Sequence, residues 1–140
     1  MARTDSEKPE GPADGARRAL ERARDDAARL ADDLRAELAS IGESTEANPD
    51  DEHDAEGSTV GYERARVTGL LERAERALGD ATAALERVRE GSYGSCLRCG
   101  AAIADERIAA LPTTTRCTAC AAAPPEAPWA KARSRRPSVG

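Results

Sequence analysis

Two long stretches of the chain repeat an apolar residue every three or four positions, with polar residues between them. That spacing gathers the apolar residues on one face of an α-helix, so we expect amphipathic helices at about residues 15–40 and 58–90. The first stripe comprises Leu20, Ala23, Ala27, Leu30, Leu34, Leu38 and Ile41, and the second Val60, Val67, Leu70, Leu71, Ala74, Leu78, Ala81, Leu85 and Val88. A short polar segment joins two stripes of similar length, which predicts a long antiparallel helical hairpin (a coiled coil). Pairing between two copies of the chain stays open as an alternative.

Single residues predict where these helices begin and end. Asp14 is suited to cap the first helix, and Ser58 or Thr59 to cap the second. Gly42 and Gly91 stand where each helix would end in the left-handed conformation.

The composition favours long, closely packed helices over a wide globular core. The chain has 140 residues and no Phe, and its aromatic residues are Tyr62, Tyr93 and Trp129. Alanine and leucine supply most of the apolar content, and small side chains bury little area. Gly69 and Gly79 interrupt the second helix at about 1 kcal/mol each relative to alanine, unless they permit close approach of the facing helix.

Acidic residues crowd the segment between the two helices. Residues 43–56 hold seven carboxylates and no Lys or Arg, and such crowded like charges repel one another. At the tip of an arm roughly 40 Å long, they would deliver negative charge into a narrow positive or metal-containing site. The alternative is a polar turn that happens to be acidic. The only histidine, His53, is expected to be an exposed polar residue.

The four cysteines form two pairs, Cys96-x-x-Cys99 and Cys117-x-x-Cys120, with 17 residues between the pairs. This spacing predicts a tetrahedral Zn²⁺ site with four thiolate ligands, which is structural because no position is left open for water. Two disulfides would need an oxidising compartment, and a redox-active pair would need a thioredoxin-like context that is missing. The N-terminus has no apolar core of a signal peptide and no run of about 18 apolar residues occurs, so we expect a cytoplasmic protein without membrane contact.

These features divide the chain into four parts. We expect a disordered leader at 1–13, a helical hairpin at 14–90 with an acidic tip at 43–57, a four-cysteine zinc module at 91–123, and a basic flexible tail at 124–140. The fold class is mainly α with disordered termini. Trp129 in the tail is a candidate docking anchor.

A resemblance to a known family rests on residues 83–120. The lead-in Gly91-x-Tyr93-Gly94-x-Cys96 and the later run Arg107-Ile108-x-Ala110-x-Pro112, together with the cysteine spacing, resemble the zinc finger of the DksA/TraR family. The acidic run at 50–54 resembles the tip of actinobacterial-type members. Residues expected to pack around the metal module are Tyr93, Ile103, Ile108 and Leu111.

The resemblance implies a function for the acidic tip. Family members bind bacterial RNA polymerase, insert the hairpin into its secondary channel and alter initiation through tip residues in the pattern Asp-x-x-Asp-x-Ala. Asp51 and Asp54 match the two acids, whereas Glu56 stands at the alanine position. A second alignment puts Asp50 and Ala55 at the ends of the pattern, with histidine in place of the second acid. We prefer Asp51 and Asp54 as the polymerase-modulating residues.

We therefore expect a non-enzymatic, zinc-binding transcription regulator with RNA polymerase as its partner. Family members often act with the alarmone ppGpp, but Asp80 stands where a lysine would be expected, so ppGpp binding is not predicted. Residues 91–140 carry 7 basic and 3 acidic side chains, which is too small an excess for strong direct nucleic-acid binding. The alternative function is a zinc-stabilised helical adaptor or oligomerisation protein without polymerase contact.

Overall fold

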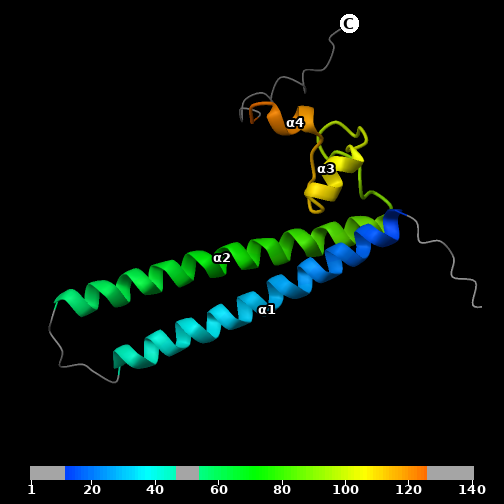
Figure 1. Ribbon diagram of the computed structural model, residues 1–140. Coiled ribbons are helices and arrows are strands. Elements are labelled where there is room, and N and C mark those ends of the chain that lie inside the picture. The colour runs from blue at the N-terminus through cyan, green and yellow to red at the C-terminus, as the bar shows by residue number, and fades with distance from the viewer. Residues whose placement is uncertain (1–11, 47–53, 126–140) are drawn as a thin grey trace, which may run out of the picture.

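The computed structural model describes residues 12–46 and 54–125, so residues 1–11, 47–53 and 126–140 lie outside the described ranges. Most of the predicted leader, the centre of the acidic tip and most of the predicted tail fall there, whereas residues 12 and 13 of the predicted leader are helical. The described helices are α1 (Pro12–Glu46), α2 (Asp54–Glu90), α3 (Asp105–Ala110) and α4 (Thr118–Ala122). Helices α1 and α2 lie side by side as an antiparallel hairpin, and α3 and α4 belong to a small module at the end where α1 begins (Figure 1). The mainly helical hairpin fold is confirmed.

Both long helices extend closer to the tip than the sequence predicted. Helix α1 passes through Gly42 and ends at Glu46, and α2 begins at Asp54 rather than near residue 58. The prediction that Gly42 ends a helix in the left-handed conformation is wrong, because Gly91, Gly94 and Gly100 are the described glycines with positive φ. Glycine is tolerated inside a helix at modest cost when the residues on both sides continue it.

The other predicted helix end is confirmed. Gly91 follows α2 with a φ of 77°, and the N–H groups of Ser92 and Tyr93 both donate to the Arg87 carbonyl, at 2.9 and 3.1 Å. These bonds satisfy a carbonyl that the last helical turn leaves without a partner and redirect the chain into the small module. At the same end of the hairpin, α1 begins at Pro12, so the prediction that Asp14 caps this helix is wrong. Asp14 lies in the first turn of α1, where its charge suits the helix dipole.

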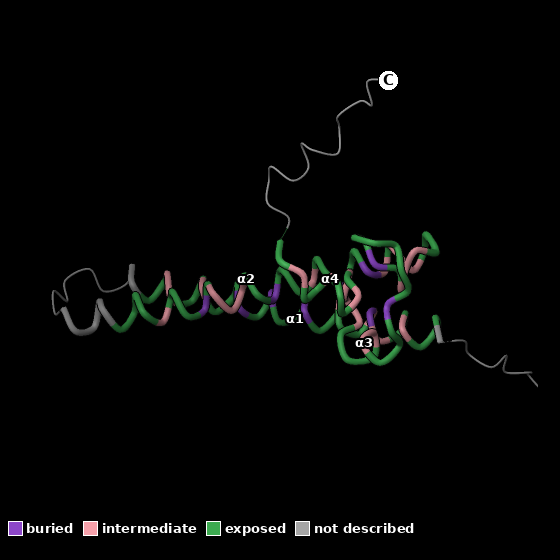
Figure 2. The backbone as a smooth tube through the Cα atoms, turned by 90° about the horizontal axis from the view of Figure 1, so that it is seen from above, coloured by how far each residue is buried: buried purple, intermediate pink, exposed green. Residues whose placement is uncertain are grey.

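The hairpin core is a narrow seam of mostly small side chains. Leu20 and Val67 are fully buried, and a cluster of Ala31, Leu34, Val67 and Ala74 lies at its centre. Buried positions recur at intervals along both helices (Figure 2). Leu30 and Val60 were predicted to belong to the seam, but they are 51% and 38% exposed, respectively. Two helices cover only a thin stripe of each other, and Ala31 occupies the interface position next to Leu30.

Gly69 and Gly79 do not mediate a close approach of the helices. A Cβ atom built on either glycine would meet nothing within 4 Å. The interpretation of these residues as helix-contact glycines is therefore wrong, and they simply weaken α2 relative to alanine.

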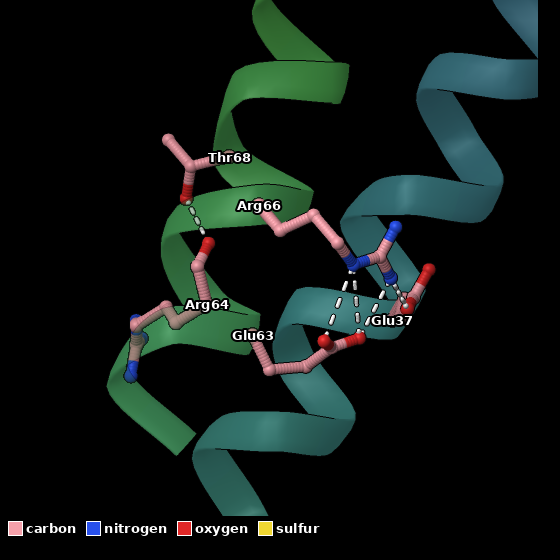
Figure 3. Close-up of polar contacts among 5 residues, drawn as sticks. All are labelled: Glu37, Glu63, Arg64, Arg66 and Thr68. Carbon is pink, nitrogen blue, oxygen red and sulfur yellow. Dashed lines mark hydrogen bonds and ion pairs between the residues drawn. The ribbon is translucent and has the colours of Figure 1, made fainter. Parts of the chain in front are cut away.

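Two ion pairs cross the hairpin and mark its register. Arg35 lies 2.8 Å from Glu75, and Arg66 lies 3.2 Å from Glu37 while also contacting Glu63 on its own helix (Figure 3). All these side chains are substantially exposed, so solvent screens each pair and each contributes little to stability. Their main structural consequence is to show which levels of α1 and α2 face each other. None of the described helices is long and apolar enough to cross a membrane.

Candidate metal centre

The first cysteine pair sits on a tight turn held by backbone hydrogen bonds. Cys96 N–H donates to the Ala101 carbonyl, and Gly100 N–H donates to the Cys96 carbonyl, both at 2.8 Å. Gly100 has a φ of 74°, a conformation that favours glycine directly after the second cysteine of the pair. An isolated antiparallel bridge between Ser95 and Ala102 closes the base of the turn. The turn therefore presents both sulfurs toward one side.

The second cysteine pair is positioned by a helix rather than by a bridge. Cys117 precedes α4 with an extended backbone, and Cys120 lies within α4. Ala121 N–H donates to the Cys117 carbonyl at 2.9 Å, which forms the first turn of that helix. Leu97 N–H donates to the Thr115 carbonyl at 2.9 Å, so the backbone of the first cysteine pair is bonded to the segment that leads into the second pair.

The four sulfur atoms converge on one point. The Sγ atoms of Cys96, Cys99, Cys117 and Cys120 all lie within 4.8 Å of one another. Cys99 Sγ and Cys117 Sγ are 3.8 Å apart, far beyond the roughly 2.05 Å of a disulfide, and all four cysteines are free. A tetrahedron with Zn–S bonds of about 2.3 Å has edges of about 3.8 Å. The thiol cluster fits a zinc ion without rearrangement of the backbone.

The electrostatics of the cluster suit a cation. Backbone N–H groups of Cys117 and Cys99 lower the pKa of the Cys96 thiol to about 6. Hydrogen bonding to the thiols of Cys117 and Cys99 raises the pKa of Cys120 to about 12, because its proton is shared with sulfurs that are themselves acceptors. Four thiolates cannot coexist at this distance without a neutralising charge, and a divalent cation supplies one.

A few contacts outside the cysteines hold the module together and attach it to the hairpin. Ile103 is 4% exposed, and the Tyr93 hydroxyl donates to the Pro112 carbonyl at 2.7 Å. Burial of Tyr93 raises the pKa of its phenol. Leu111 was predicted to pack around the metal but is 53% exposed, because it caps the C-terminal end of the short helix α3. A module this small buries few apolar side chains and depends on its metal.

Arginines that the sequence analysis did not single out for this role, among them Arg107 and Arg87, donate hydrogen bonds to carbonyl groups of the module. Arg107 Nε donates to the Arg116 carbonyl at 2.8 Å, just before the second cysteine pair. Arg87 Nη2 lies 3.5 Å from the Thr113 carbonyl and so connects the last turn of α2 to the module. The sequence carries no periodic signal for such bonds, since the arginines could equally face solvent.

Helix α2 begins at the end of the hairpin opposite the metal centre (Figure 1). Asp51 lies outside the described residues, and Asp54 is the first residue of α2, with its side chain also outside them. Helix α2 has 37 residues, which corresponds to about 55 Å between the tip and the module. The assignment of Asp51 and Asp54 stays a prediction, and so does the division of the chain into four parts.

Comparison with known proteins connects this arrangement to a family. Residues 91–124 match the family model described as the prokaryotic dksA/traR C4-type zinc finger. The whole fold is similar to the structure of transcription factor DksA2 from Pseudomonas aeruginosa, with a TM-score of 0.68, 27% sequence identity and coverage of 91% of this chain and 89% of that one. An uncharacterized protein of Aquifex aeolicus (strain VF5) is 47% identical over 38 residues, which span 27% of this chain and 26% of that protein.

These likenesses and the sulfur geometry agree about the metal. A C4-type zinc finger needs four clustered thiols, and the described residues provide one such cluster at the matched segment. Zinc is therefore the cofactor that the finger carries, and the predicted DksA/TraR resemblance is confirmed for the finger and the fold. Nothing in the comparisons tests the actinobacterial subtype.

Proposed function

We propose that this DksA-like protein, with its DksA/TraR-type zinc finger, is a non-enzymatic transcription regulator that binds bacterial RNA polymerase. The hairpin would enter the secondary channel of the polymerase, and the acidic tip would modulate initiation. The observation that carries the proposal is the separation of parts: an acidic segment closes one end of a hairpin about 55 Å long, and a zinc finger stands at the other. The likeness to DksA2 over 91% of the chain supports the same reading.

In this proposal Cys96, Cys99, Cys117 and Cys120 hold Zn²⁺. The zinc would stabilise the module by neutralising the thiolates and by cross-linking the two cysteine pairs. The finger's backbone bonds to α2 then fix its orientation at the base of the hairpin. Asp51 and Asp54 would bring negative charge to the region of the polymerase active site, where basic groups and metal ions offer complementary charge.

The experiment is a transcription assay paired with a pull-down by core RNA polymerase. We expect Asp51→Asn/Asp54→Asn to retain binding and lose the effect on initiation, because the amides keep the shape and remove the charge. The matched control is Asp33→Asn/Asp80→Asn, which makes the same change of charge at exposed positions on the shafts of α1 and α2.

Equal activity of the tip variant and the wild-type protein would remove the tip assignment. A stable dimer that does not bind polymerase would overturn the proposed function and favour the adaptor alternative. A cytoplasmic location, and the absence of membrane, nucleic-acid and ppGpp binding, remain predictions.

A further inference from the structure

Gly42 on α1 and Gly61 on α2 lie at the same distance from the tip of the hairpin. The ion pair between Arg66 and Glu37, at 3.2 Å, marks a level at which the two helices are opposite each other. Gly42 lies five residues beyond Glu37 along α1, and Gly61 lies five residues before Arg66 along α2. Since α1 and α2 are antiparallel, both glycines lie about 7.5 Å beyond the ion pair toward the tip.

Neither glycine is required by the fold. Both lie inside helices without a positive φ, and a Cβ atom built on either would meet nothing within 4 Å. Alanine would therefore fit at both positions and would form helix more readily. This distinguishes them from Gly94, whose φ of 86° favours glycine and whose added Cβ would lie 3.6 Å from Ile108 Cδ1.

Tertiary packing also thins at the level of the two glycines. Val67 is fully buried and Ile41 packs against the core cluster. Beyond Val67 toward the tip, Val60 is 38% exposed and Tyr62 is 74% exposed. Among the side chains that the structure describes, none between Val67 and the tip on α2, and none beyond Leu34 on α1, is buried. Little apolar contact therefore opposes bending of the helices here.

A side-chain hydrogen bond further weakens the same turn of α1. Ser44 Oγ donates to the Ser40 carbonyl at 2.9 Å, and the two serines bracket Gly42. A serine that bonds the carbonyl four residues back competes with the helical N–H for that acceptor and often bends the helix. Sharp kinks in helices concentrate at combinations of glycine and serine. The same kind of bond brackets Gly79, where Thr82 Oγ1 donates to the Leu78 carbonyl at 2.7 Å, but Ala81 beside that glycine is buried. The thin packing is therefore what sets the level of Gly42 and Gly61 apart from the rest of the hairpin.

We propose that Gly42 and Gly61 form a two-helix hinge that lets the distal ends of α1 and α2 bend relative to the shaft. The shaft, from Val67 and Leu34 to the finger, stays straight because its seam is packed. The hinge is a property of the isolated protein. Its use, to adapt the angle of the acidic tip inside a narrow channel, rests on the proposed function.

Hydrogen–deuterium exchange of the zinc-loaded, full-length protein tests the hinge directly. We compare Gly42→Ala/Gly61→Ala with Gly69→Ala/Gly79→Ala, which adds the same two methyl groups where they also meet nothing within 4 Å. In the wild-type protein, amides at 41–46 and 59–65 should exchange faster than those around Val67 and Ala74. The first variant should slow the distal amides by about fivefold in each helix, and the second should leave them unchanged.

Two results would overturn the hinge. One is distal amides that are as protected as the shaft in the wild-type protein. The other is equal slowing of the distal amides by both double variants. In transcription assays, Gly42→Ala/Gly61→Ala should weaken the effect on initiation at least severalfold, whereas Gly69→Ala/Gly79→Ala should retain it. If the wild-type protein has no effect on polymerase, the proposed function fails, and the exchange data still decide the hinge.

Discussion

Shortening Val67 to alanine tests whether the seam between α1 and α2 is packed as described. Val67 is fully buried among Ala31, Leu34 and Ala74. Val60 belongs to the same sequence stripe on α2 but is 38% exposed. Replacing valine with alanine therefore removes buried volume at position 67, whereas at position 60 it shortens a side chain that is already exposed.

The magnitude follows from three contributions. Removing two methyl groups from a buried site costs about 1.6 kcal/mol in transfer free energy. A cavity of about 50 Å³ that does not collapse adds about 1 kcal/mol. Alanine has a better helix propensity than valine, which offsets about 0.6 kcal/mol of this loss of stability. We expect Val67→Ala to lower the free energy of unfolding by about 2 kcal/mol, and Val60→Ala to change it by less than about 0.5 kcal/mol in either direction.

Urea unfolding followed by far-UV circular dichroism measures both values, with the zinc concentration held constant because bound metal shifts the apparent stability. Unchanged m-values would show that the variants unfold from the same folded state. Equal losses at the two positions, or a loss below about 0.5 kcal/mol for Val67→Ala, would refute the packed seam.

Three further predictions concern the finger. Gly94→Ala should lower the free energy of unfolding by about 1–2 kcal/mol in the same urea assay, because a Cβ atom is strained at a φ of 86°. An unaffected variant would contradict this. Tyr93→Phe should lower the free energy of unfolding by about 1 kcal/mol, because the hydrogen bond to the Pro112 carbonyl is lost. A neutral result would show that water bonds the Pro112 carbonyl in place of the Tyr93 hydroxyl. Chelation of the zinc should abolish the near-UV circular dichroism signal of Tyr93, which lies in the module that the metal holds together. Most of the far-UV ellipticity should remain, because α3 and α4 have only 6 and 5 residues, whereas α1 and α2 have 35 and 37. Complete loss of helix on chelation would show that the hairpin cannot fold without the metal.

The features that sequence predicted well depend on local spacing. Apolar residues every three or four positions predicted the hairpin because a helix repeats its faces at that interval. The two cysteine pairs predicted the thiol cluster because a spacing of three residues leaves both sulfurs on one side of the chain, on a tight turn for the first pair and on the first turn of α4 for the second. The helix end at Gly91 was also predictable, since the glycine is followed by a segment with no helical periodicity.

The errors arose where the outcome depends on the facing surface. Whether Leu30 or Ala31 enters the seam depends on the width of the contact with α2, which periodicity within α1 does not encode. Gly42 resembles a helix end locally, but helical bonds continue on both sides of it. The bonds of Arg87 and Arg107 to carbonyls of the finger join groups that no pattern in the chain relates, so sequence gave no reason to expect them.

The most direct test of the account is to locate the tip on the polymerase. A photo-crosslinking residue at position 54 should label polymerase segments that line the secondary channel near the active site. The same residue in place of Leu97, which is 65% exposed on the finger at the other end of the molecule, should label a different segment outside that channel. Absence of crosslinks from position 54, or labelling of one outer surface from both positions, would contradict insertion of the hairpin.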